Sequence, residues 1–270
     1  MNISSLSPEG QVLFNRFRSR LPHRQELDAV IKCLPRKKSD GMVMLDIGMP
    51  SPVMSAFLRE SGGVWATAAR SPEFAEEASR FLESEVVCLD ANGTIPFEQH
   101  SFDVVVVSLG MLAAMQDSEF FIRECNRVLK SAGQLIISTQ YRKSFSFINV
   151  LRNRAQKSVG GMIGGAYTER GLFRFLKTGF DVISVDSYSG FFVEMVRIHE
   201  YQLLMAGMEE EEVSSRVRLK YWFAEQLDFF TLWARGYVII VHARRRQWRE
   251  RATPVLADGR TIHEAVLKHT

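Results

Sequence analysis

Phe102-Asp-Val-Val-Val-Val-Ser108 is the stretch of sequence that decides the fold. Its four consecutive valines make an unbroken apolar run, which is typical of a strand covered on both faces of a parallel sheet. Residues 117–130 follow with the apolar spacing of an amphipathic helix, and Gly133 opens a second apolar strand over 134–139. The sequence therefore predicts a strand, a helix and a further strand, with the sheet buried from both sides.

The same alternation of strands and helices extends in both directions from this unit. Ser71-Pro72-Glu73 has the residues of a helix start, and Thr168 those of a helix cap. Strands are expected at 42–47, 64–69, 86–89, 180–185 and 235–243, and helices at 12–34, 53–60, 74–82 and 168–176. Residues 141–165 are expected to form a loop. This order favours an α/β fold with a doubly wound, mostly parallel sheet, whose ligands bind at the carboxyl ends of the strands.

A helical insertion separates the last two predicted strands. Residues 190–234 are too long for a hairpin turn, and aromatic side chains recur in them at helical spacing, which is more often ordinary core than an acceptor pocket or a dimer face. Glu194 and His199 lie five positions apart, a poor spacing for a base and its orienting partner on one helix, so unrelated surface or cap roles are expected. The expected organisation is an N-terminal helical segment (1–40), an α/β core (41–189), the helical insertion or cap (190–234), the last core strand (235–247) and a tail (248–270).

Composition and charge exclude several classes of function. The chain has 270 residues, and its 34 Lys and Arg against 31 Asp and Glu give a net charge of +3, which does not predict nucleic-acid binding. Three widely spaced cysteines predict neither a disulfide framework nor a zinc site, and they favour a reducing, cytoplasmic location. No clustered His, Cys and carboxylate set suggests any other metal. No signal peptide is expected, and the most apolar stretch, 104–115, is too short to span a membrane.

Four segments, taken together, resemble the class I S-adenosylmethionine-dependent methyltransferases of the small-molecule type. The segments are Val43-Met-Leu-Asp-Ile-Gly48, Asp90-Ala-Asn-Gly-Thr-Ile-Pro-Phe97, Ser101-Phe-Asp-Val-Val-Val-Val107 and Phe121-Ile-Arg-Glu-Cys-Asn-Arg-Val-Leu-Lys-Ser-Ala-Gly133. The resemblance covers residues 41–141 and implies a seven-stranded sheet whose last strand is antiparallel. It also implies a pocket for S-adenosylmethionine beyond the first four strands, with Asp46, Gly48, Asp90 and Leu109 as the expected cofactor-binding residues.

The sequence departs from the family pattern where that pattern serves chemistry. The glycine loop carries Pro50 and Pro52, and proline can neither adopt a left-handed turn nor donate a backbone N–H. Ala69 stands where the family has an acid that binds the ribose hydroxyls, a task that requires carboxylate oxygens. Residues 112–115 lack the histidine that many small-molecule members carry after the fourth strand, so no catalytic residue is identified. Tyr141 lies in the region that faces the acceptor, as a pocket residue or an ordinary loop aromatic.

Two functions remain open at this point. The favoured one is a non-catalytic scaffold or regulatory protein that keeps the fold and binds a protein partner or another ligand. The alternative is an active methyltransferase with atypical cofactor binding, acting on a small-molecule acceptor such as a sugar, a lipid-linked intermediate or a hydrophobic compound. An open crevice near Gly48, Asp90 and Leu109 would favour the enzyme, whereas Pro50 or other side chains filling it would favour the scaffold.

Three further segments carry weaker expectations. The inserted helices 190–234 are a candidate homodimer face. Arg244-Arg-Arg-Gln-Trp-Arg-Glu-Arg251 could bind an anionic surface, although a solvated tail is the more ordinary interpretation. The glycine pairs within 160–165 lack the Lys and the context of a phosphate loop and suggest a hinge instead.

Overall fold

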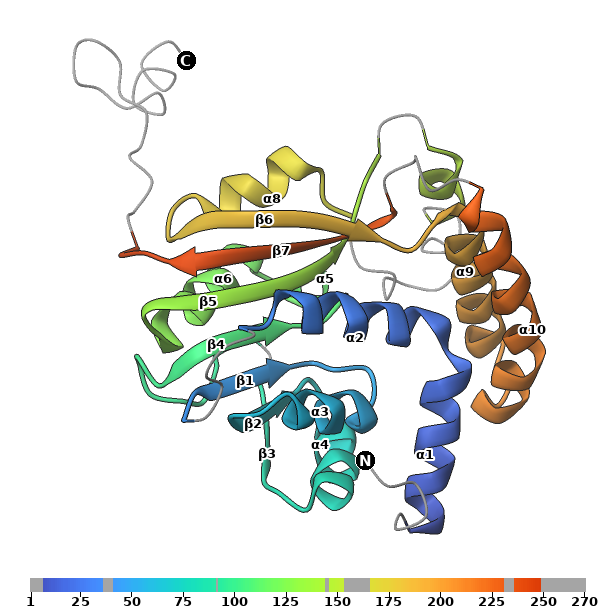
Figure 1. Cartoon of the computed structure of the whole chain (residues 1–270), viewed down its shortest axis with the longest axis horizontal. Coiled ribbons are helices and arrows are strands. Elements are labelled where there is room, and N and C mark those ends of the chain that lie inside the picture. The colour runs from blue at the N-terminus through green and yellow to red at the C-terminus, as the bar shows by residue number, and fades with distance from the viewer. Residues whose placement is uncertain are drawn as a thin grey trace, which may run out of the picture.

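A seven-stranded mixed sheet forms the centre of the molecule, with helices on both faces (Figure 1). The computed structural model describes residues 7–35, 41–90, 92–143, 146–152, 166–230 and 236–248. The strand order is β3-β2-β1-β4-β5-β7-β6, and β7 runs antiparallel to both of its neighbours. The predicted doubly wound sheet with an antiparallel last strand is therefore confirmed. The strands are β1 (Val43–Ile47), β2 (Val64–Ala69), β3 (Val86–Cys88), β4 (Phe102–Val107), β5 (Leu129–Gln140), β6 (Phe180–Tyr188) and β7 (Val238–Arg245).

The valine run of β4 is divided between two hydrophobic cores, one on each face of the sheet. Val105 and Val107 pack in the core that α6 and α8 cover, while Val104 and Val106 pack in the core beneath α1, α2 and α3. Successive side chains of a strand point to opposite faces, so burial of all four valines requires helices on both sides. The helices are α1 (Pro8–Ser19), α2 (Leu21–Cys33), α3 (Pro52–Glu60), α4 (Pro72–Leu82), α5 (Met111–Ala114), α6 (Ser118–Val128), α8 (Glu169–Leu176), α9 (Phe191–Met205) and α10 (Glu210–Phe229).

The prediction of a single leading helix is wrong, because the segment forms two helices. The helix α1 ends at Ser19, Arg20 is extended with φ −95° and ψ 94°, and α2 begins at Leu21 with Pro22 in its first turn. Proline is accepted in the first turn of a helix, whereas in a helix interior it removes a hydrogen bond and clashes with the carbonyl four residues earlier. Pro22 therefore turns the chain at this point, and α1 lies beside α10 (Figure 1).

The prediction of one loop over 141–165 is also wrong in part, because residues 147–152 are helical. Ile148 of this helix is fully buried with Ile198 of α9 and Tyr237 at the start of β7. The glycine pairs within 160–165 and the arginines at 249 and 251 lie outside the described residues.

The inserted helices α9 and α10 pack together at the end of the sheet toward which β1, β4 and β5 point (Figure 1). Val213, Val217, Tyr221 and Ala224 form the buried side of α10 and meet Val193 of α9. The insertion is thus helical, as predicted, and it borders the edge where the site is expected.

The strand β6 forms one of the two outer edges of the sheet. Its pairing with β7 carries a register shift between Val182 and Ser184.

Candidate functional site

The predicted site residues lie along the carboxyl edge of β1, β2 and β4. Ile47 is paired with Ala68 on one side and with Val107 on the other, so Gly48 and Ser108, which follow β1 and β4, lie at the same edge as Ala69, the last residue of β2. The structure thus brings Gly48 and Leu109 to neighbouring strand ends, whereas Asp90 lies beyond the short β3.

Gly48 has the left-handed backbone that its place in the loop requires, but its open face is covered. Its φ is +67°, and its N–H donates to the Ala68 carbonyl at 2.8 Å. A Cβ at this glycine would lie only 2.2 Å from Cγ and Sδ of Met111, a buried side chain of α5. The side of Gly48 that lacks a side chain is therefore in contact with this chain's own methionine.

Asp46 is fully buried, and its carboxylate is engaged by neighbouring side chains. Ser55 Oγ donates to Oδ1 and Thr67 Oγ1 donates to Oδ2, each at 2.8 Å, while Arg59 Nη1 lies 3.7 Å from Oδ2. Burial raises the pKa of this carboxyl to about 6, and the nearby Arg59 opposes the rise. Asp46 thus connects β1 to α3 and β2, and its role in binding a cofactor stays a prediction.

The backbone of Leu109 is hydrogen-bonded to a side chain of α2. Its backbone N–H donates to Glu26 Oε1 at 2.7 Å, and Ser108 Oγ donates to the same oxygen at 2.8 Å. Glu26 is only 2% exposed, and burial raises the pKa of its carboxyl. A carboxylate from α2 therefore accepts the hydrogen bonds of the polar groups that follow β4, at the place where a cofactor was expected.

A small cavity lies between α2, α9 and the loops that follow β1 and β4. Its volume is about 110 Å³, and it is lined by Arg20, Pro22, His23, Glu26, Pro50, Leu109, Arg197 and Glu200. Pockets for cofactors and drug-sized ligands have volumes of about 300–1,000 Å³. Burial, with help from Arg20 and Arg197, lowers the pKa of His23 to about 3, so this imidazole is neutral at physiological pH. The cavity holds a water or a small ion more readily than a nucleoside.

Asp90 is exposed and closes a turn within its own segment. Its Oδ1 accepts the N–H of Thr94 at 2.7 Å and that of Asn92 at 3.0 Å. These hydrogen bonds, that of Thr94 above all, lower the pKa of Asp90. The contacts are those of an Asx turn, the ordinary role of an aspartate at a strand end, and a ligand role for Asp90 stays a prediction.

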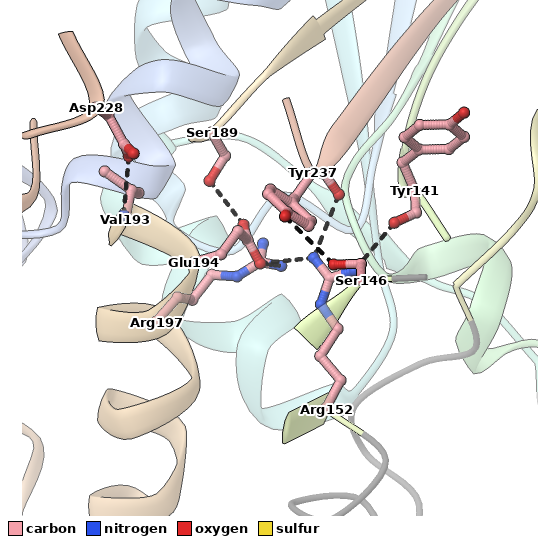
Figure 2. Close-up of polar contacts among 9 residues, drawn as sticks. All are labelled: Tyr141, Ser146, Arg152, Ser189, Val193, Glu194, Arg197, Asp228 and Tyr237. Atoms are coloured by element: carbon pink, nitrogen blue, oxygen red, sulfur yellow. Dashed lines mark hydrogen bonds and ion pairs between the residues drawn. The ribbon is translucent and has the colours of Figure 1, made fainter. Parts of the chain in front are cut away.

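A buried ion cluster at this edge was missed by the sequence analysis (Figure 2). Glu194 has no exposed surface, and its Oε2 lies 2.6 Å from Nη2 of Arg152 and 2.6 Å from Nη2 of Arg197. Ser189 Oγ donates to Oε1 at 2.6 Å. The surface or cap role expected for Glu194 is therefore wrong, whereas His199 is indeed apart from it, near Lys220.

The cluster also joins the helical insertion to the sheet. Arg152 donates to the carbonyls of Tyr141 and Tyr237, each at 3.2 Å, from the helix 147–152 (Figure 2). Asp228 of α10 accepts the N–H groups of Phe192 and Val193 in the first turn of α9. Tyr141 directly follows β5, so the hydrogen bond from Arg152 to its carbonyl fixes the end of this strand. No sequence signal links Arg152 with Glu194, because they are 42 residues apart and lie in different elements.

Replacing Gly48 with alanine is expected to lower the free energy of unfolding by about 2 kcal/mol, because a left-handed backbone costs an L-residue about 1–2 kcal/mol and the new Cβ displaces Met111. Chemical denaturation measures the loss. Gly110→Ala is the matched control, because Gly110 also has a positive φ but its Cβ would meet nothing within 4 Å. In a Met111→Ala background the cost of Gly48→Ala should shrink, and strictly additive effects would show that the two residues do not interact.

Residues 45–137 match the family model described as a methyltransferase domain. This segment contains Gly48, Asp90, Leu109 and the strand–helix units around them. This part of the chain is similar to methyltransferase domains, and the chain has the fold of S-adenosylmethionine-dependent methyltransferases. A search of curated protein sequences gave no significant match.

Solved structures share the fold of this chain at low sequence identity. An S-adenosylmethionine-dependent methyltransferase from Mesorhizobium loti has a TM-score of 0.54 and 18% identity, covering 81% of this chain and 96% of that one. The YcgJ protein from Bacillus subtilis has a TM-score of 0.57 and 15% identity, covering 84% and 99%. The cyclase SpnF has a TM-score of 0.54 and 17% identity, covering 81% and 78%. At these identities the likeness shows the fold alone.

Within the described residues, no group of three or more His, Cys, Asp and Glu side chains is placed to hold a metal ion. None of the helices in the described part of the chain has both the length and the apolar character that crossing a bilayer requires.

Proposed function

We propose that this chain is a non-catalytic member of the class I methyltransferase family and acts as a scaffold or regulatory protein. The observation that carries the proposal is the contact of Met111 with Gly48. In this fold the glycine's bare backbone is the surface over which a cofactor's methionine part would lie, and Met111 covers it. A ligand would first have to displace a side chain that is 96% buried, which forfeits its packing.

Glu26 supports the same conclusion on the other side of the crevice. The N–H of Leu109 is a donor at the edge where ligands of this fold bind, and it already serves the Glu26 carboxylate at 2.7 Å. Displacing this carboxylate would leave Ser108 Oγ and the Leu109 N–H to be satisfied by the ligand. Met111 and Glu26 thus occupy two groups at this edge, the open face of Gly48 and the Leu109 N–H, that a cofactor would otherwise contact.

Two absent groups, one in a side chain and one in the backbone, add to this support. Ala69 ends β2 with no carboxylate for ribose hydroxyls, and Pro50 lines the 110 Å³ cavity without a donor N–H. The similarity to the structure of the cyclase SpnF illustrates that the fold by itself does not dictate methyl transfer. The alternative, an active methyltransferase, is favoured by the left-handed backbone that Gly48 retains.

The proposal is tested by calorimetric titration of the purified chain with S-adenosylmethionine and with S-adenosylhomocysteine. No heat of binding is expected, and native mass spectrometry should find no nucleoside that remains bound through purification. Thermal unfolding with and without about 1 mM cofactor provides a second readout, because a ligand at 100 times its Kd stabilises a protein by about 2.7 kcal/mol. Micromolar binding in either experiment would contradict the proposal and direct the work toward methyl acceptors.

A further inference from the structure

The C-terminal half of α10 presents large apolar side chains to solvent. Trp222 is 55% exposed, Phe223 is 53% exposed and Phe230, just after the helix, is 75% exposed. Leu219, Leu227 and Phe229 are exposed as well. Contiguous apolar surface of this kind on a water-facing helix marks a place where another surface binds.

These side chains are not the rim of the hydrophobic core, because α10 already buries its opposite side. Val217, Tyr221 and Ala224 pack inward at spacings of four and three residues. Trp222 and Phe223, which lie three and four residues after Leu219, are exposed with it on the other side. Large apolar side chains that gather on the outer side of a helix are expected to be covered by another surface. Within the part of the chain that the structure describes, Leu219, Trp222 and Phe223 on the solvent side of α10 are therefore left exposed, and α10 forms an outer edge of the molecule (Figure 1).

A basic groove runs beside this apolar face. It has a volume of about 870 Å³ between α1 and α10, and Arg16, Arg18, Arg24 and Arg218 line it together with a single acid, Glu225. Leu219 and Trp222 belong both to the groove and to the exposed face. Arginine binds phosphate oxygens with its planar fork of donors, so the groove suits a phosphate-bearing partner.

We propose that this face docks onto the surface of an anionic phospholipid bilayer. The arginines of the groove would contact headgroup phosphates, and the aromatic side chains of α10 would enter the boundary between headgroups and acyl chains. A bilayer supplies anionic and apolar partners side by side, which matches the order of groups along this face. A symmetric pair of copies would instead bring two arginine-lined grooves close together. The inference does not depend on whether the crevice binds a cofactor.

Co-sedimentation with vesicles tests the proposal. The whole chain is expected to pellet with phosphatidylcholine vesicles that contain phosphatidylglycerol, to stay in solution with phosphatidylcholine alone, and to be released as salt is raised. Arg218→Gln should weaken binding about fivefold, because a basic residue near an anionic surface contributes about 1 kcal/mol. The pair Trp222→Ala and Phe223→Ala should weaken it about tenfold or more. These side chains are more than half exposed, so the variants are expected to fold, which circular dichroism verifies.

Matched controls lie on other parts of the surface. Arg170→Gln on α8 removes an exposed arginine, and Ile183→Ala on β6 removes an apolar side chain that is 49% exposed; neither should change vesicle binding. Absence of binding to anionic vesicles, equal binding to neutral ones, or equal loss in the controls would overturn the proposal. Analytical ultracentrifugation provides one more test. The proposal would also be overturned if the chain failed to bind vesicles and formed a dimer that the Trp222 and Phe223 substitutions dissociate.

Discussion

Replacing Glu194 with alanine is expected to lower the free energy of unfolding by about 3–5 kcal/mol, because it leaves two arginines facing an empty buried site. The Arg152 side chain is only 4% exposed, while that of Arg197 is 18% exposed. Ser189 also loses the acceptor of its hydroxyl. Urea denaturation followed by circular dichroism measures the change.

Glu212 provides a matched control for this prediction. It forms an ion pair with Arg216 at the same 2.6 Å distance, but both side chains are more than half exposed. An exposed pair contributes about 0–1 kcal/mol, so Glu212→Ala should be nearly silent. Equal losses at the two positions would show that burial does not determine the strength of the cluster.

The pH dependence of the Glu194 effect has a definite sign. Burial acts to raise the pKa of Glu194, but Arg197 and Arg152 outweigh it, and the pKa is lowered below its usual value. A carboxyl whose pKa falls on folding stabilises the folded state above its unfolded pKa, and this contribution is lost as pH falls through the folded pKa. The difference between the unmodified chain and Glu194→Gln should therefore shrink in acid.

Replacing Asp46 with asparagine is expected to remove a pH dependence of about 3 kcal/mol from the stability. The pKa of the buried carboxyl rises from 3.8 to about 6 on folding, and each unit of rise corresponds to about 1.4 kcal/mol. Because the folded pKa is the higher one, this contribution is complete below the unfolded pKa and is lost as pH rises through about 6. Asparagine can keep one hydrogen bond with Ser55 or Thr67 without carrying a charge.

Denaturation curves of the two proteins across that range measure the difference. The Asp46→Asn chain should gain stability over the unmodified chain as pH rises from about 4 to about 7. Asp181→Asn is the control, because Asp181 is 63% exposed in its side chain and should give a nearly constant difference. If the stabilities of the unmodified chain and of Asp46→Asn changed with pH in parallel, the Asp46 carboxylate would have to be solvated at neutral pH.

Local rules predicted most of the fold. The valine run of β4 required a sheet covered on both faces, and Ser71 and Asp117 cap their helices through side-chain oxygens, as residues of these types do. The break at Pro22 was missed although the rule that predicts it is local, since the apolar spacing around it continued across the turn.

The contacts of Glu26 and Met111 at the strand ends could not be predicted in the same way. Glu26 and Leu109 are 83 residues apart, and Met111 meets Gly48 only because β1 and β4 are neighbours in the sheet. The sequence showed that Pro50 and Ala69 lack the expected groups, but it contains no signal for which side chains fill the space. Tertiary packing chooses these partners, and a pattern within a short window does not record them.

The two outer strands of the sheet determine how copies of this protein can meet. An exposed strand edge is a template for another strand, the first step of ordered aggregation. Here β3 has only three residues, and the register shift in β6 between Val182 and Ser184 interrupts the regular ladder beside the exposed Ile183. Both edges are therefore poor templates for intermolecular β-pairing, which leaves association to the helical surfaces.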